Sequence, residues 1–83
     1  MLLTIDIGNT NIHLGVFDDQ RLVCTCRLST DSRRLADEYS LTISSILAFK
    51  GVAIADIGGA SICSVVPTLT STLEEVCRQY FQV

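Results

Sequence analysis

Apolar and polar side chains alternate along the first part of the chain with the two-residue period of half-buried β-strands. The apolar positions of the first stretch are Leu3, Ile5 and Ile7, and those of the second, which runs to about Phe17, are Ile12, Leu14 and Val16. Between them lie residues 8–11, which are Gly, Asn, Thr and Asn and favour tight turns. The pattern therefore predicts a β-hairpin whose polar tip is residues 8–11 (the hairpin tip).

A third alternating stretch follows a short turn at residues 18–20. One face of this stretch carries Leu22, Cys24, Cys26 and Leu28. Consecutive strands with short connections usually form an antiparallel meander, so we expect one here. Residues 29–34 are polar and unpatterned, which predicts a loop.

From about Leu35 the apolar period changes from two to 3.6 residues, which predicts a helix. The stripe on this helix consists of Tyr39, Ile43, Ile46, Leu47 and the aliphatic stem of Lys50. Gly51 fits the position just after a helix end. The start is open, because Leu35 occupies the place of a cap that would pair with Glu38, whereas Ser32 could cap one turn earlier.

The last third of the chain predicts a connector, a strand and a second helix. Residues 52–59 form the connector, with a turn at 55–57, and residues 60–66 are small and β-branched, as in strands buried between layers. Pro67 ends this strand and suits the first turn of a helix that runs to about Tyr80. The apolar stripe of that helix is Leu69, Leu73, Val76, Cys77 and Tyr80.

The predicted order is therefore βββαβα. A right-handed crossover through the first helix would make the fourth strand parallel to the first. Residues 64–67 would then lie at the same end of the sheet as Asp6 and the hairpin tip, where ligands of open α/β sheets tend to bind. These residues are either a second wall of a site or simply a strand end and a helix start.

Composition narrows the class of protein. With 83 residues, 48% of them hydrophobic, and a net charge of −3, the chain fits one small soluble domain. The acidic balance argues against a nucleic-acid platform. No apolar run reaches the roughly 20 residues that cross a bilayer, and no signal-peptide pattern is evident, so we expect a cytoplasmic protein with no membrane partner.

The cysteines are Cys24, Cys26, Cys63 and Cys77, and the single histidine is His13. Their spacing matches neither a zinc site nor a disulfide framework, so we expect reduced and mostly buried thiols.

The hairpin tip carries the candidate chemistry. Backbone N–H groups, two amides and a hydroxyl can donate hydrogen bonds to phosphate oxygens. Asp6, at the end of the first strand, can hold a hydrated magnesium ion. The same residues also fit an ordinary hairpin turn beside a solvated carboxylate, and the pattern alone leaves both interpretations open.

Four short motifs, spread over nearly the whole chain, resemble those of one known family. Residues 6–11, Asp-Ile-Gly-Asn-Thr-Asn, resemble the phosphate-1 motif of the actin, sugar-kinase and Hsp70 superfamily. The asparagines flanking Thr10, together with residues 27–31, 36–39 and 64–67, resemble type III pantothenate kinases in particular. Leu35 departs from the threonine that is common there, which we expect to cost a helix cap.

This resemblance implies an α/β fold, a ribonuclease H-like (actin-like ATPase) half-domain. Residues 1–83 would be the N-terminal part of the first ATPase-like domain, with the second domain absent from this chain. The implied activity is ATP-dependent phosphorylation of pantothenate, the first step of coenzyme A synthesis. The implied cofactors are Mg²⁺ and a monovalent cation (K⁺ or NH₄⁺), and the implied assembly is a homodimer.

The resemblance also implies the site residues. The ATP-binding and phosphate-binding positions would be Asp6, Ile7, Gly8, Asn9, Thr10, Asn11, Ile12 and His13. Asp6 would be the magnesium ligand, and for His13 a structural role is favoured over a catalytic one. The family's Gly-x-Asp-Arg segment with its catalytic aspartate, its cation ligand and its second phosphate motif do not occur here. We therefore expect an N-terminal fragment of a protein about three times as long, inactive alone and with no certain catalytic residue of its own.

Two other functions stay in view. A ribonuclease H-like nuclease shares the element order and could use Glu38 as a second metal ligand, but the fourth strand offers Ser61 and Ser64 where a carboxylate is needed. A non-catalytic regulatory or interaction domain of the same superfamily is the other. The fourth strand is expected to be an open edge with Ile62, Val65 and Val66 poorly covered, which favours association with another chain.

Overall fold

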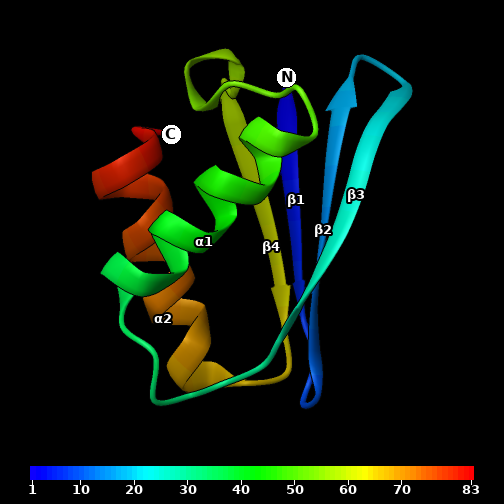
Figure 1. Ribbon diagram of the computed structural model, residues 1–83. Helices are drawn as coiled ribbons and strands as arrows, with labels where there is room; N and C mark the ends of the chain where they lie inside the picture. The colour runs from blue at the N-terminus through cyan, green and yellow to red at the C-terminus, as the bar shows by residue number, and fades with distance from the viewer.

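A computed structural model describes residues 1–83 as a four-stranded sheet with two helices against it (Figure 1). The strands are β1 (Leu2–Ile7), β2 (Asn11–Asp18), β3 (Arg21–Ser29) and β4 (Gly59–Ser64). The helical segments are α1 (Ala36–Phe49), the 3-10 turn η1 (Ile54–Asp56), α2 (Pro67–Glu75) and a closing π-helical turn η2 (Val76–Phe81). The predicted α/β class and βββαβα order are confirmed.

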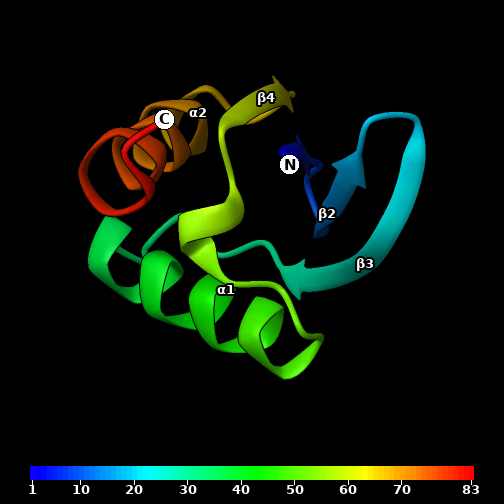
Figure 2. The same cartoon turned by 90° about the horizontal axis from the view of Figure 1, so that it is seen from above.

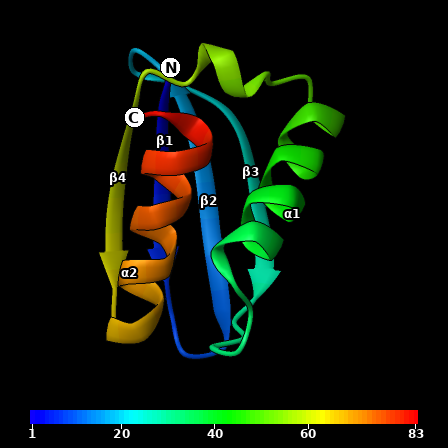
Figure 3. The ribbon, with the colours of Figure 1, turned by 90° about the vertical axis from the view of Figure 1, so that its left-hand side faces the viewer.

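The sheet has the order β3-β2-β1-β4, in which β1, β2 and β3 are antiparallel neighbours and β4 runs parallel to β1. The predicted meander and the predicted parallel crossover are both confirmed. Both helices cover the same face of the sheet (Figure 2), with α1 in front of β2 and β3 and α2 in front of β1 and β4 (Figure 3). The other face, called the outer face here, carries no helix.

The two-residue alternation of the strands separates these faces. Every second side chain of β1 and β2 points at the helices and is buried, and the helical stripes meet them from the other side. The fully buried positions are Leu3, Ile5, Ile7, Ile12, Val16, Tyr39, Ile43, Leu47, Leu69, Leu73 and Val76. Burial of one such aliphatic side chain contributes about 1.5–3 kcal/mol, so this single core holds the layers together.

A β-bulge in β3 changes one predicted orientation. Val16 pairs with Cys24 but Phe17 pairs with Leu22, so Val23 is an extra residue in the ladder. The predicted placement of Leu22 beside Cys24 and Cys26 is therefore wrong. Leu22 is 51% exposed and lies on the outer face near Phe17.

β4 is shorter and more exposed than predicted. Ser64 ends it, because its hydroxyl donates to the carbonyl of Val66 (3.1 Å) and accepts from the Val66 N–H (3.0 Å), which turns the chain two residues early. No residue of β4 is fully buried, since its outer face is open and only β1 pairs with it. The predicted open edge is present: Ile62 and Val66 are half-buried, and Val65 is 65% exposed.

Local hydrogen bonds define both ends of α1. Leu35 is the N-cap, and its N–H donates to the carboxylate of Glu38 (2.9 Å), so Ser32 does not start the helix. At the other end Gly51 has φ of +84°, and its N–H and that of Val52 donate to the carbonyls of Ala48 (3.0 Å) and Leu47 (2.8 Å). This pair of bonds is a Schellman motif, and it confirms Gly51 as the helix stop.

Two residues of the predicted stripes lie outside the core. Lys50 is exposed beyond the end of α1. Tyr80 is 43% exposed, and its hydroxyl donates to the carboxylate of Asp37 on α1, which raises the pKa of Tyr80. This contact ties η2 to the start of α1 from the surface. Neither helix has the length and apolarity that crossing a membrane would require.

The incomplete cap of α1 can be tested by substitution. Leu35→Ser should raise the free energy of unfolding by about 0.5–1 kcal/mol, because a serine hydroxyl can accept from the Asp37 N–H, which has no acceptor, whereas the Glu38 N–H already donates to the Leu35 carbonyl (3.0 Å). Leu35 is 66% exposed and its backbone is already extended (φ −88°, ψ 164°), so little packing is lost. Urea denaturation measures the difference.

Leu41→Ser is the matched control, since Leu41 is 70% exposed in the interior of the same helix. Serine is a weaker helix former than leucine, so this control should be slightly destabilising. Equal losses of stability in the two variants would contradict the capping account.

Candidate functional site

The hairpin tip lies where β1 and β4 both end. Since these strands are parallel, their carboxyl ends meet at one edge of the sheet, with Ile7 opposite Ser64. The N–H of Val65 donates to the carbonyl of Ile7 (3.0 Å), so the predicted proximity of residues 64–67 to the tip is confirmed. The tip, the end of β4 and the start of α2 lie together at the bottom of Figure 1.

Four side chains form a row across the outer face next to the tip. Asp6 of β1 lies opposite His13 of β2 and opposite Cys63 of β4. His13 in turn lies opposite Arg27 of β3. All four side chains are exposed, and Asp6 makes neither an ion pair nor a side-chain hydrogen bond within the chain.

The predicted phosphate-binding residues divide into two groups. Asn9, Thr10, Asn11 and His13 are exposed, and His13 lies opposite Asp6. Ile7 and Ile12 are fully buried, so their side chains belong to the core. Only the backbone of these two isoleucines could face a ligand.

The backbone donors of the tip are fewer than the sequence suggested. The N–H of Gly8 is not free, because it donates to the carbonyl of Asn11 (2.9 Å) and closes the hairpin. The N–H groups of Asn9, Thr10 and Asn11 have no acceptor within the chain. These three donors, with the side chains of residues 9–11, are what the tip can offer to an anion.

The space beside the Gly8 backbone is tight for any side chain. Its φ is not positive, so any residue could adopt the backbone conformation. A Cβ at this position would lie 3.1 Å from the carbonyl oxygen of Asn11, inside ordinary contact distance. A larger residue would therefore push against the bond that closes the hairpin.

Thr30, which follows β3, holds the tip from the side. Its hydroxyl donates to the carbonyl of Gly8 (2.8 Å), and its N–H donates to the carbonyl of Thr10 (2.9 Å). The sequence analysis assigns no role to Thr30, which belongs there to a resembling motif and to a polar loop. Its residue type and position do suggest one, because a hydroxyl residue at the end of a strand beside the hairpin can reach unpaired tip carbonyls.

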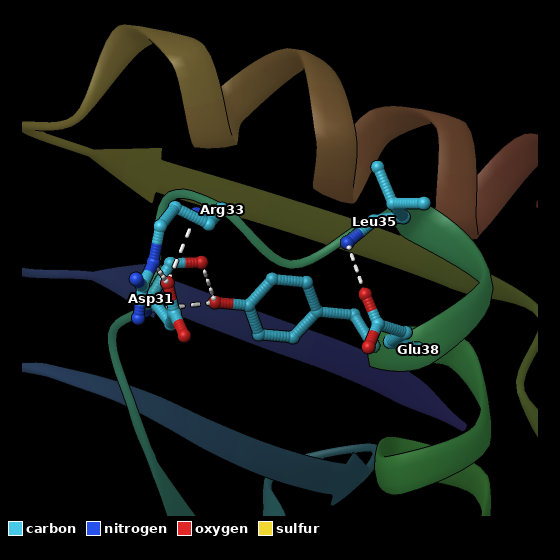
Figure 4. A network of polar contacts seen from close by, with 5 residues as sticks. Asp31, Arg33, Leu35 and Glu38 are labelled. Carbon is cyan, nitrogen blue, oxygen red and sulfur yellow. Dashed lines mark hydrogen bonds and ion pairs between the residues drawn. The ribbon is translucent and has the colours of Figure 1, made fainter.

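The segment that carries Thr30 is anchored in turn by Asp31. The buried hydroxyl of Tyr39 accepts from the Asp31 N–H (3.0 Å) and donates to the Asp31 carbonyl (2.8 Å). Figure 4 shows the carboxylate of Asp31 accepting hydrogen bonds from Arg33, which hold the pKa of Asp31 below its usual value. Figure 4 also shows Glu38 turned away toward Leu35.

That orientation of Glu38 bears on the nuclease alternative. Its carboxylate caps α1, and so it is engaged at the helix start and not beside Asp6. No group of three or more His, Cys, Asp or Glu side chains lies close enough to hold a metal ion. Glu38 is therefore engaged elsewhere and does not supply the second metal ligand that the nuclease alternative assigns to it.

The site is an exposed edge and not an enclosed cavity. A depression of about 860 Å³ follows β3 and touches Asn11 and His13, but it includes neither Asp6 nor residues 8–10. A second, of about 350 Å³, lies between β4 and α2 and reaches none of the tip residues. The chemistry of the tip therefore does not coincide with either hollow.

The thiols differ in exposure more than the sequence suggested. Cys63 is exposed next to Asp6, Cys24 and Cys26 are half-buried, and only Cys77 is fully buried. The expectation of mostly buried thiols is therefore wrong for Cys63. Its position on the outer face of an edge strand is the reason.

Comparison with known proteins finds a matching family model and similar sequences. A family model described as type III pantothenate kinase matches residues 2–83. The chain is 48% identical over 81 residues to the type III pantothenate kinase of Geotalea uraniireducens (strain Rf4), covering 98% of this chain and 32% of that protein. It is 47% identical over 83 residues to that of Roseiflexus sp. (strain RS-1), covering 100% and 32%. It is 45% identical to that of Halalkalibacterium halodurans, covering 100% and 33%. The chain thus spans about a third of the length of these curated relatives.

The exposure of Cys63 leads to a test of the site's accessibility. In the folded protein iodoacetamide should alkylate Cys63 first and Cys77 slowest. Burial raises the pKa of the Cys26 and Cys77 thiols, so at neutral pH a smaller fraction of each is the reactive thiolate. Mass spectrometry of the digested protein measures each rate, and in urea the four rates should converge. Equal rates for Cys63 and Cys77 in the folded state would contradict the predicted order.

Proposed function

The chain belongs to the type III pantothenate kinase family, and from this premise we propose that the protein carrying it transfers phosphate from ATP to pantothenate, the first step of coenzyme A synthesis. The observation that carries the proposal is the hairpin tip. It offers N–H donors without an internal acceptor at the carboxyl ends of two parallel strands, beside an exposed carboxylate. The direct test is whether the full-length protein consumes ATP only when pantothenate is present.

We assign the phosphates of ATP to the tip. The N–H groups of Asn9, Thr10 and Asn11 donate to phosphate oxygens, and the hydroxyl and amides of residues 9–11 add further donors. The α2 N-terminus, which begins at Pro67 beside the tip, contributes a favourable positive potential. In phosphoryl transfer the protein acts mainly by positioning phosphates and offsetting their charge, and the tip has the groups for both.

Asp6 fits a magnesium ligand. Magnesium usually keeps several waters and takes one or two carboxylates, and Asp6 is exposed with no internal partner that would compete for it. When bound, the ion supplies charge neutralisation on the phosphates. Asp6 would hold it beside the tip, with His13 in the next position of the same row.

The rest of the activity is proposed for the whole protein. We assign no residue among these 83 to pantothenate, to the monovalent cation (K⁺ or NH₄⁺) or to the proton acceptor of the reaction. The homodimeric assembly and cytoplasmic location belong to the same proposal. They rest on membership of the family, whose curated members are about three times as long as this chain.

The role of Asp6 can be separated from folding. In the full-length protein Asp6→Asn should lower pantothenate-dependent ATP turnover by about 100-fold or more, because metal assistance contributes several kcal/mol. The melting temperature should stay unchanged, since the Asp6 side chain makes no contact that its amide would lose. Turnover and thermal unfolding are measured on the same preparation.

Asp56→Asn is the matched control for this change. Asp56 is an exposed carboxylate in η1, at the opposite end of the sheet, where its carbonyl accepts from the chain's amino terminus (2.8 Å). This variant should keep full turnover. A loss of stability in Asp6→Asn that matches its loss of turnover would show that Asp6 is structural.

The donors of the tip can be tested through Thr10. Thr10→Ala in the full-length protein should weaken ATP binding or turnover by about 1–3 kcal/mol, the usual contribution of a hydrogen bond to a charged group. Thr25→Ala is the control, because Thr25 is an exposed threonine on β3 with no side-chain hydrogen bond and should change nothing. Unchanged ATP kinetics in Thr10→Ala would contradict the assignment of the ATP phosphates to the tip.

A further inference from the structure

We propose that Thr30 is a positioning residue, which turns the N–H groups of the hairpin tip toward the phosphates of ATP. The inference rests on the proposed function, since it concerns the same nucleotide site. Thr30 itself lies at the end of β3, on the side of the tip away from β4. It need not touch the ligand to act.

The argument starts from the planarity of the peptide bond. In a trans peptide the C=O and the following N–H point in opposite directions, and the chain has no cis peptide. The Thr30 hydroxyl draws the Gly8 carbonyl toward β3 (2.8 Å), so the N–H of Asn9 must point the other way. The Thr30 N–H holds the Thr10 carbonyl (2.9 Å), so the N–H of Asn11, which belongs to the same peptide, also points away from β3.

The hydroxyl bond is the one that the hairpin does not supply by itself. The bond from the Thr30 N–H to Thr10 extends the pairing of β2 with β3 by one step. The bond from the hydroxyl reaches past β2 to Gly8, at the end of β1. Without it, the Gly8–Asn9 peptide has no contact from its carbonyl to the chain and could rotate.

Thr30 is held firmly enough to act in this way. The N–H and the carbonyl of its neighbour Asp31 are both bonded to the hydroxyl of Tyr39, a fully buried residue of α1. The guanidinium of Arg34 covers the ring of Tyr39 at 5.1 Å from its centre. These contacts connect Thr30 to α1, so the orientation of the tip N–H groups depends on the packing of that helix.

The test removes the hydroxyl alone. In the full-length protein Thr30→Val keeps the size and the backbone N–H but loses the bond to Gly8. We expect KM for ATP to rise about three- to tenfold, the factor that loss of one hydrogen bond represents. KM for pantothenate should stay unchanged. Thr30→Ser retains the hydroxyl and should restore the KM for ATP to within about twofold.

Thr25→Val, the same change on the same strand at an exposed threonine without a side-chain bond, should leave both constants unchanged. If the wild-type protein shows no pantothenate-dependent turnover, the proposed function fails. If the wild type is active and Thr30→Val binds ATP normally, the role of Thr30 is overturned. Equal rises of both KM values, without rescue by serine, would also overturn it.

A second measurement applies if Thr30→Val does not fold. In the ¹⁵N-labelled wild-type protein, titration with Mg-ADP should shift the amide resonances of Asn9 and Asn11 strongly, because their N–H groups face the phosphates. The Gly8 amide, which is bonded to Asn11, should shift less. Shifts confined to Gly8, or absent from Asn9 while Mg-ADP binds, would overturn the proposed orientation.

Discussion

The parallel pairing of β1 with β4 is the constraint on which the rest of the structure depends. It brings two carboxyl strand ends to one edge, and it is possible only because α1 and η1 carry the chain back across the helix face. The core made by Ile5, Ile7 and the helical stripes stabilises that pairing. The side chain of Asp6 is exposed on the outer face, whereas those of Ile5 and Ile7 are buried under the helices. One strand therefore contributes to both the polar site and the core.

Much of this fold follows from periodicity in the sequence. The alternation of Leu3, Ile5 and Ile7 predicts β1 and its buried face, and Gly51 predicts the end of α1, because both are local signals. The misplaced elements depend on contacts that the period of apolar residues does not describe. The bulge at Val23 exists only relative to the register of β2, and β4 ends at Ser64 because a side chain competes with the ladder.

The candidate site divides in the same way. The polar tip and Asp6 are visible as residue types in a turn, and the structure places them together with the turn after β4. Which donors are available is not visible, because the N–H of Gly8 is used within the hairpin whereas those of Asn9 and Thr10 are not. The contact of Thr30 with Gly8 spans three strands, so the sequence shows a hydroxyl residue at the strand end but does not show which carbonyl it reaches.

The same crossover has a consequence for how the chain is made. The meander β1–β2–β3 forms from neighbouring segments, but about 50 residues separate β1 from its parallel partner, and closing such a loop has an entropic cost that grows with its length. During synthesis β1 therefore remains an edge strand until residues 59–64 have left the ribosome. The tip can take its hairpin shape before then, but the edge where Ile7 meets Ser64 and Val65 is assembled last. The end of the molecule that carries the hairpin tip is therefore completed after folding has begun, once β4 has been synthesised.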